Sequence, residues 1–340
     1  MLSRLSRTLS VAASALFLAA CATPDITIEE LPKQSLQQER DIQFQQAFKY
    51  QSDLNKRLAE VARPLLKHSV NDCGKRTRYS AGIFLHKSNE YPKEQLTAAK
   101  ELYGKSEYVQ ILNVLDSGPS KDKLLPGDQI KMINHENIPD NKTAHAIKQL
   151  NAAMAEGDDV EMQLLREGES LSVTLSPELI CDYAVVLSAS DAVNGYADGS
   201  QIIITAGLMR FLQKDEQLAF IIAHELAHNT LDHIPKKLTN GAVGAVIDLV
   251  LTGAGFPSPL LATGIGANLY SQSFETEADL EALRLMHNAG YPIQGMDEVW
   301  RQMARLHPST ITHGQSISHP TTAERALRIR SRIQQLIHED

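Results

Sequence analysis

The 340-residue sequence lacks an excess of basic residues. It holds 33 Lys and Arg against 41 Asp and Glu, which gives a net charge of −8 at pH 7. Proteins that bind nucleic acid usually present a basic face, because contacts to phosphates supply much of the affinity. We therefore expect no nucleic-acid partner. With 43% hydrophobic residues, the chain has enough apolar material for one large domain or two smaller ones.

The start of the chain lacks an apolar run long enough to cross a bilayer. Arg4 and Arg7 precede the short run "VAASALFL", and this is the pattern of a cleaved export signal over residues 1–20. The ending "LAAC" resembles the lipobox of bacterial lipoproteins. That resemblance implies lipidation of Cys21 and, with Ala22 after it, sorting to the periplasmic face of the outer membrane. Ordinary secretory cleavage, which leaves Cys21 as a thiol, is the alternative.

Cysteine is scarce, with three in the whole chain. Beyond Cys21 there are Cys73 and Cys181, and an export signal places them in an oxidising compartment where pairing is expected. Loss of the signal also removes two arginines, so the net charge of the mature chain becomes about −10. Residues 21–34 are polar and are expected to form a tether to the membrane.

A long amphipathic helix is predicted over residues 35–70. Apolar residues recur at helical intervals up to Leu65, among charged residues. Pro64 lies inside this pattern and leaves a break in the last turns as an alternative.

Residues 71–178 have a different pattern, with short strand-like runs between turns. The stretches "VQILNVLDSGPSKDKLLPGDQIKMINHENI" and "DVEMQLLREGESLSVTL" resemble a bacterial PDZ domain, in which the turn Pro126, Gly127 and Asp128 opens a strand. The loop that would hold a peptide carboxylate departs from the PDZ pattern, because Ala81–Phe84 has one of the two expected glycines. Peptide binding by strand addition is therefore an open question.

The stretch "LAFIIAHELAHNTLDHIP" carries the strongest chemical signal. Residues four apart share one face of a helix, so His224 and His228 present two imidazoles to one point, with Glu225 beside them. This is the geometry of a zinc pair with a general base. The alternative is a chance match, with histidines that are ordinary core residues.

The third ligand distinguishes two classes of zinc site. His233 is a weak candidate, because a third histidine from the same stretch should lie six residues after His228 with a glycine between them. A second helix over "SFETEADLEALRL" offers Glu275, Glu277 and Asp279, of which Glu275 and Asp279 share one face with Ala278 beside them. Two histidines, one carboxylate and an open fourth position are typical of catalytic zinc. A solvated acidic face is the alternative.

The sequence at this point resembles the gluzincin zinc peptidases, which include the heat-shock protease HtpX and the CAAX prenyl protease. Four segments carry the resemblance, in the expected order within residues 180–330: "NGYADGSQIIITAGLM", "DEQLAFIIAHELAHN", "FETEAD" and "SHPTTAERALRI". The resemblance implies one zinc ion held by His224, His228 and Glu275. It assigns catalysis to Glu225, which would take a proton from the attacking water and pass it to the leaving amine.

The same resemblance suggests supporting roles for four further residues. Asp279 would accept a hydrogen bond from a ligand imidazole, and Arg325 would brace Asp279 or a ligand glutamate. His319 would donate to the oxyanion or block the open zinc position, with a structural His-Pro turn as the alternative. Asn194 would begin the substrate-binding strand, where Gly195 departs from the family's usual alanine, as Asp198 does from its proline.

The resemblance also implies how the regions are connected. The helix over residues 35–70 and residues 179–340 would form one metallopeptidase domain, and the PDZ-like domain would be inserted between them. Cys73 and Cys181 flank the insertion, so a disulfide at its neck is predicted. The overall class is α+β, with a mostly helical zincin-type domain, a small sheet and a β-rich insertion.

The second apolar stretch, residues 249–274, has no charged residue. Pro257, Pro259 and several glycines interrupt it, so a helical hairpin that covers the cleft or touches the membrane surface is favoured over a membrane span.

The sequence thus predicts a lipid-anchored zinc endopeptidase that acts on unfolded or misassembled envelope proteins. Two alternatives are a non-catalytic chaperone or adaptor that binds partners through the PDZ-like domain, and a binding lipoprotein with structural zinc. Intact Glu225 argues against the first and the three-ligand site against the second.

Overall fold

The computed structural model describes residues 30–233, 272–313 and 321–339. Residues 1–43 form one compact unit, whose described part is the start of helix α1 (Lys33–His68), and residues 44–340 form the other. Helix α1 is continuous through Pro64, so the break that the proline allowed does not occur. Burial of Leu58, Val61 and Leu65 on its second half offsets the lost backbone hydrogen bond.

The β-rich region (residues 77–181) has its own apolar core. Its main sheet has the order β2-β3-β4-β6-β7, with β5 paired to β4 and all pairs antiparallel. The strands are β2 (Ile83–His86), β3 (Val109–Val114), β4 (Gln129–Ile133), β5 (Glu136–Asn137), β6 (Val160–Arg166) and β7 (Glu169–Leu175). The helices are η1 (Lys93–Gln95), α2 (Leu96–Tyr103), η2 (Pro139–Asn141) and α3 (Thr143–Ala153).

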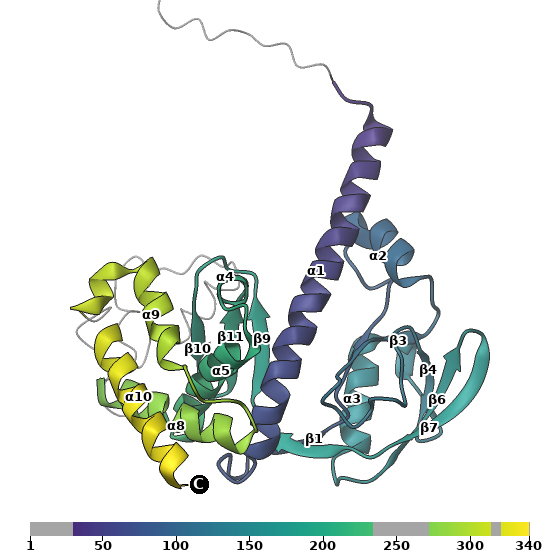
Figure 1. Ribbon diagram of the computed structural model, residues 1–340. Helices are drawn as coiled ribbons and strands as arrows, with labels where there is room; N and C mark the ends of the chain where they lie inside the picture. Colours follow the sequence, from purple (N-terminus) through teal and green to yellow (C-terminus); the bar gives the residue numbers. More distant parts are fainter. Residues whose placement is uncertain (1–29, 234–271, 314–320, 340) are drawn as a thin grey trace, which may run out of the picture. The chain divides into compact units, whose positions relative to one another are not determined.

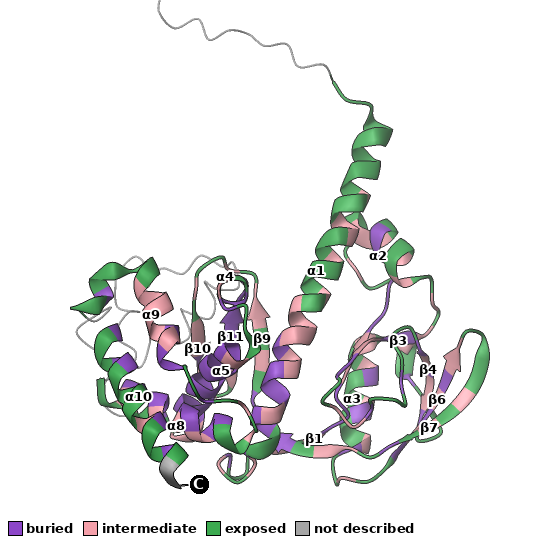
Figure 2. Ribbon diagram, viewed as in Figure 1, coloured by how far each residue is buried: buried purple, intermediate pink, exposed green. Residues whose placement is uncertain are grey.

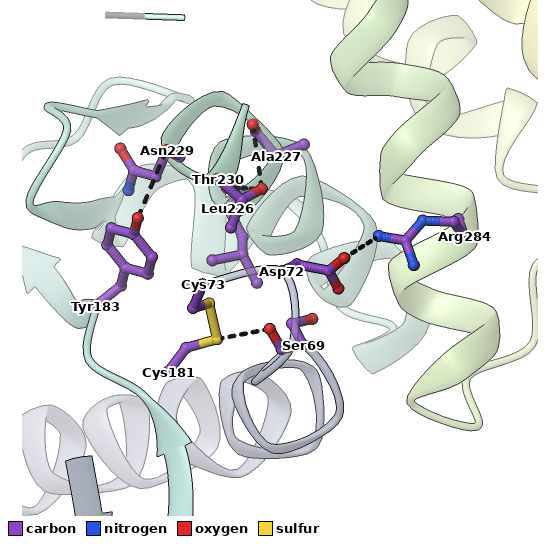
Figure 3. The surroundings of a disulfide bond; sticks show 10 residues. All are labelled: Ser69, Asp72, Cys73, Cys181, Tyr183, Leu226, Ala227, Asn229, Thr230 and Arg284. Atoms are coloured by element: carbon purple, nitrogen blue, oxygen red, sulfur yellow. Dashed lines mark hydrogen bonds and ion pairs between the residues drawn. A yellow bond between two sulfur atoms is a disulfide. The ribbon is translucent and has the colours of Figure 1, made fainter. Parts of the chain in front are cut away.

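A two-stranded ribbon begins and ends this region. Strand β1 (Thr77–Ser80) pairs antiparallel with β8 (Glu178–Cys181). Next to the ribbon, Cys73 and Cys181 form a disulfide that closes a 108-residue separation (Figure 3). Arg284 forms an ion pair of 2.7 Å with Asp72, the residue before Cys73. The disulfide therefore holds the beginning and the end of the β-rich region next to each other.

The helical region (residues 182–339 with the second half of α1) holds a second apolar core. A three-stranded sheet has the order β10-β11-β9, with β10 antiparallel and β9 parallel to β11. The strands are β9 (Ala184–Ser188), β10 (Gly195–Ala197) and β11 (Gln201–Thr205). The helices are α4 (Ala206–Phe211), α5 (Asp215–Thr230), α8 (Gln272–Asn288), α9 (Asp297–Leu306), η5 (Pro308–Ile311) and α10 (Thr322–Glu339). Figure 1 shows the path of the chain through these elements.

Helix α5 is the centre of the helical region. Every residue from Gln217 to Asn229 is buried, as Figure 2 shows for the ribbon of this helix. A helix without a polar face is typical of a position inside a core. It packs on α8 and on the sheet. Across the described ranges, no helix combines the length and apolar character that a membrane span requires. The two cores and the mixture of elements confirm the predicted α+β class.

Candidate metal centre and active site

Three side chains from two helices meet inside the helical region. His224 and His228 lie on α5 and Glu275 lies in the first turn of α8, and all three are buried. The Nε2 atoms of the two histidines are 3.1 Å apart. The carboxylate of Glu275 lies 3.6 Å from Nε2 of His224 and 3.5 Å from Nε2 of His228. One donor atom from each residue thus points to a common centre.

These separations fit a metal ion with tetrahedral ligands. With zinc–nitrogen and zinc–oxygen bonds near 2 Å, two ligand atoms of a tetrahedron are about 3.3 Å apart. The observed separations lie between 3.1 and 3.6 Å, with Oε2 of Glu275 facing His224 and Oε1 facing His228. Two imidazoles and one carboxylate are also the donor types of catalytic zinc sites.

The balance of buried charge supports the same fit. Three carboxylates, those of Glu225, Glu275 and Asp279, are buried around one guanidinium, that of Arg325. Buried charges are normally compensated, because desolvation of an unpaired charge is costly. A divalent cation at the centre would neutralise the excess of two negative charges.

Without a metal, protons take up part of this excess. Burial, with the nearby charge of Glu275, raises the pKa of Glu225 to about 7, although the charge of His224 opposes the shift. Burial alone would lower the pKa of His224, but hydrogen bonds to Asp279 and Glu275 outweigh it and raise that pKa to about 9. Burial and the charge of His224 lower the pKa of His228, so this imidazole stays neutral.

Arg325 lies on α10 and contacts side chains of both α5 and α8, the helices that carry the cluster. Its Nε and one terminal nitrogen bind both oxygens of Asp279 at 2.7 and 2.8 Å, and the other terminal nitrogen lies 3.0 Å from Glu275. The guanidinium also stacks 3.4 Å above the ring of Trp300. Asp279 in turn lies 3.0 Å from Nδ1 of His224. Burial would raise the pKa of Asp279, but the charge of Arg325 lowers it.

A capping box sets the start of the helix that carries Arg325. The side chain of Thr321 accepts a hydrogen bond from the backbone N–H of Glu324, and the Glu324 carboxylate accepts one from the N–H of Thr321. This reciprocal pair satisfies backbone donors at the start of α10. Arg325 follows at once and projects into the core from the first turn.

Strand β10 lies directly beside Glu225. A Cβ at Gly195 would be 3.1 Å from Ile221 and 3.5 Å from Cγ of Glu225, so the strand passes close to α5 at the residue that follows His224. Asn194 precedes this strand, and its side-chain oxygen accepts a hydrogen bond from the N–H of Gly195. Oε2 of Glu225 is buried and has no hydrogen-bond partner among the described residues. Strand β10 and the carboxylate of Glu225 therefore lie next to each other.

One further histidine, His233, contacts the cluster and is itself in contact with Glu277. Nδ1 of His233 lies 2.9 Å from Nδ1 of His228, and its Nε2 lies 3.2 Å from the carboxylate of Glu277. His233 is not part of the three-residue cluster. Local spacing in the sequence gives no signal for these contacts, because the position of His233 depends on the left-handed conformation of Asp232.

Some predicted features lie outside the described residues. These are Cys21 with its lipobox, His319, and residues 249–271 of the expected hairpin. Residues 272–274 form the first turn of α8.

A groove of about 380 Å³ lies between β2 and α3 of the β-rich region and residues of α1 and β9. Gly82 and Phe84 line one side and Leu150 the other, and Arg63 of α1 also borders it. Gly82 has φ +70° and lies against Gly118, where a Cβ would meet Cα at 3.0 Å. The glycine that the loop retains is therefore the one its backbone requires. Peptide binding in this groove stays a prediction.

Comparisons with known proteins agree with this geometry. The model of peptidase family M48 matches residues 160–333, and the model of the PDZ domain matches residues 87–176. The mitochondrial metalloendopeptidase OMA1 of Saccharomyces cerevisiae is 30% identical over 111 residues, which are 32% of this chain and 32% of that protein. The protein of the same name from Arabidopsis thaliana is 25% identical over 194 residues, 52% of this chain and 40% of that protein.

A bacterial relative is also similar. The beta-barrel assembly-enhancing protease of Escherichia coli is 25% identical over 122 residues, 32% of this chain and 25% of that protein. The chain therefore spans between a quarter and two fifths of these relatives. Among solved structures, the HtrA-type protease AlgW with a decapeptide has a TM-score of 0.24 and 22% identity over 30% of each chain.

Proposed function

This chain belongs to peptidase family M48, and on that premise we propose that it is a zinc-dependent metalloendopeptidase. The observation that carries the proposal is the buried cluster of His224, His228 and Glu275, whose donor atoms all lie within 4.8 Å of one another. These three residues would hold the zinc ion, and Glu225 would be the catalytic base. When bound, zinc supplies Lewis-acid activation of the attacking water and of the scissile carbonyl.

The chain's own residues would then move the proton. Glu225 accepts the proton of the attacking water at a carboxylate oxygen and donates it to the nitrogen of the leaving amine. A glutamate is one of the side chains that can act both as general base and as general acid in this way. Strand β10, which begins after Asn194, would bind the substrate backbone beside Glu225. Asp279 would orient the ring of His224, and Arg325 would hold the carboxylates of Asp279 and Glu275 in position.

The proposed substrates are unfolded or misassembled envelope proteins of a Gram-negative bacterium. The bacterial relative is named for enhancing the assembly of β-barrels, and the export signal with Cys21 supports attachment to the periplasmic face of the outer membrane. A PDZ domain accompanies the peptidase, and such domains bind extended peptides at an exposed strand. His319 is proposed to act at the same site, on the oxyanion or the open zinc position.

Metal content and casein cleavage test the proposal together. The full chain, expressed with its own leader and purified in detergent, should hold one zinc ion and cleave casein. Glu225→Gln should keep the zinc and lose cleavage by at least about 100-fold, because a general base contributes 10²–10⁴-fold. His224→Ala and Glu275→Ala should weaken zinc binding. Glu216→Gln, on the same helix but outside the cluster, is the matched control and should retain both properties.

The outcomes separate the proposed functions. A wild-type protein that takes up no zinc would refute the metallopeptidase. Bound zinc without cleavage of any unfolded protein would instead support the adaptor function of the PDZ domain.

A further inference from the structure

We propose that His233 and Glu277 form a hydrogen-bonded relay that positions the ligand imidazole of His228; this inference rests on the proposed zinc site. His228 and His233 are both fully buried, and their Nδ1 atoms are 2.9 Å apart. The far nitrogen of His233 lies 3.2 Å from a carboxylate oxygen of Glu277, whose side chain is 57% exposed. The relay thus runs from the metal cluster to solvent.

The proton positions follow from the donor and acceptor rules of imidazole. Nε2 of His228 faces His224 and Glu275, so a metal-binding lone pair there requires the proton on Nδ1. That proton is donated to Nδ1 of His233, which must therefore accept. A neutral His233 then carries its own proton on Nε2 and donates it to Glu277. Each contact needs one donor and one acceptor, and this single arrangement supplies them.

The backbone and a ring contact hold His233 in place. Helix α5 ends at Thr230, and Asp232 has φ +55°, a left-handed conformation that reverses the chain after the helix. The ring of Phe274, from the first turn of α8, stacks on the ring of His233 with centroids 4.4 Å apart and planes at 10°. His233 is therefore fixed by the two helices that also supply the metal ligands.

The two ligand imidazoles are consequently oriented by different groups. A carboxylate, Asp279, lies against Nδ1 of His224, while an imidazole, His233, lies against Nδ1 of His228. Loss of such a partner typically weakens metal binding 10- to 100-fold, because the ligand ring loses its orientation and its tautomer. His233 is a positioning residue in this proposal and does not touch the metal.

Zinc competition against a chromophoric chelator tests the relay with the full chain. His233→Phe, which keeps a flat ring but no acceptor, should weaken zinc binding about 10- to 100-fold. His233→Asn should restore most of the loss, because the amide oxygen takes the place of Nδ1. Glu277→Ala should have a smaller effect, of a few fold. His307→Gln, an exposed histidine outside the site, is the control and should bind as the wild type does.

A spectroscopic measurement on the wild type covers the case in which a variant fails to fold. Long-range proton–nitrogen correlation spectra of the zinc-loaded protein should show His228 protonated at Nδ1 and His233 protonated at Nε2. The opposite tautomer of His233, or equal zinc affinity of wild type and folded His233→Phe, would overturn the relay while the zinc site stood. A wild-type protein that binds no zinc would overturn both proposals.

Discussion

Arg325 is the residue at which the buried charges of the candidate site meet. It binds both oxygens of Asp279 and one of Glu275, and the whole residue is 6% exposed. A planar fork with several donors can serve two carboxylates at once, which a lysine ammonium cannot do with the same geometry. Removal of the Asp279 charge would leave the buried guanidinium of Arg325 without this partner, and water cannot take the partner's place.

Replacement of Asp279 should therefore destabilise the fold as well as the metal site. Asp279→Asn keeps the size of the side chain but removes the charge that faces Arg325, and we expect the free energy of unfolding to fall by about 3 kcal/mol. Chemical denaturation of the metal-free protein measures this. Asp53→Asn, which breaks the exposed pair with Lys49 on α1, is the control. Equal midpoints for wild type and Asp279→Asn would contradict the role of this ion pair.

At the residue scale, much of the site could be predicted because it lies on helices. His224, Glu225 and His228 keep a fixed relation on one helix, and Glu275 and Asp279 do so on another, so spacing alone indicates shared faces. His233 could not be placed in this way. Its position depends on the left-handed turn at Asp232, and a non-glycine residue gives little signal of that conformation in a sequence.

At the scale of elements, Asn229 joins helix α5 to the hairpin of β10 and β11. Its side-chain oxygen accepts a hydrogen bond of 2.8 Å from the N–H of Gly199, and its side-chain nitrogen donates to the carbonyl of Gln201 at 3.2 Å. Both partners lie at the turn between β10 and β11. Asn229 is buried and follows His228 directly, so the turn of the hairpin is tied to the helix beside a proposed ligand.

Loss of this tie should affect stability and substrate binding. Asn229→Ala leaves two backbone groups without their partner, and we expect the free energy of unfolding to fall by about 1–3 kcal/mol. The Michaelis constant for a peptide should rise, because β10 would lose its fixed position beside Glu225. Asn229→Asp keeps the acceptor for Gly199 and should give an intermediate loss. A peptidase with unchanged Michaelis constant in Asn229→Ala would argue against an anchored edge strand.

The end of β2 carries a histidine in an aromatic cluster. The ring of His86 packs edge-on against Tyr103 at 4.6 Å and lies near Tyr91, which also contacts Phe48 of α1. Burial lowers the pKa of His86 from 6.5 to about 4. The folded protein therefore excludes a proton that the unfolded chain binds between these two pH values.

This difference predicts a pH dependence of stability. The contribution of His86 to the free energy of unfolding should be highest above pH 6.5, fall as the pH drops towards 4, and level off below it, since His86 binds more protons in the unfolded state in that window. In His86→Phe the curve should be shallower over the same window. Above pH 7 the difference between the two proteins should stay constant, which is the internal control. Parallel curves from pH 4 to 8 would show that His86 titrates equally in both states.

At the scale of the whole molecule, the disulfide between Cys73 and Cys181 crosslinks the two ends of the β-rich region. In the chain-entropy model, closure of a loop with a separation of 108 residues stabilises the fold by about 4–5 kcal/mol. A double Cys73→Ser and Cys181→Ser variant should lose a stability of this order, measured by denaturant unfolding. Both cysteines are replaced so that neither partner of the disulfide is left as a free thiol. A double variant with the wild-type midpoint would show that the neck is held without the crosslink.

Patterns in the sequence were enough to indicate the residues of the proposed active site. Helical spacing indicated the histidine pair, the glutamate base and the second acidic face, and the change from helical to strand-like patterns marked the β-rich insertion. Such signals are local, because the relation between residues four apart on a helix does not depend on the rest of the chain. The family match then gave the class that the motif indicated.

The tertiary structure decided which distant groups meet. Arg325 is 101 residues from His224 and Glu277 is 44 residues from His233, yet each pair lies within hydrogen-bonding range. Contacts of this kind depend on how α5, α8 and α10 pack, and packing is set by the fit of whole helix surfaces. The spacing of residues along the chain does not report how helix surfaces fit together. The sequence therefore suggested Arg325 only through the family resemblance, and it did not predict the contact of His233 with His228.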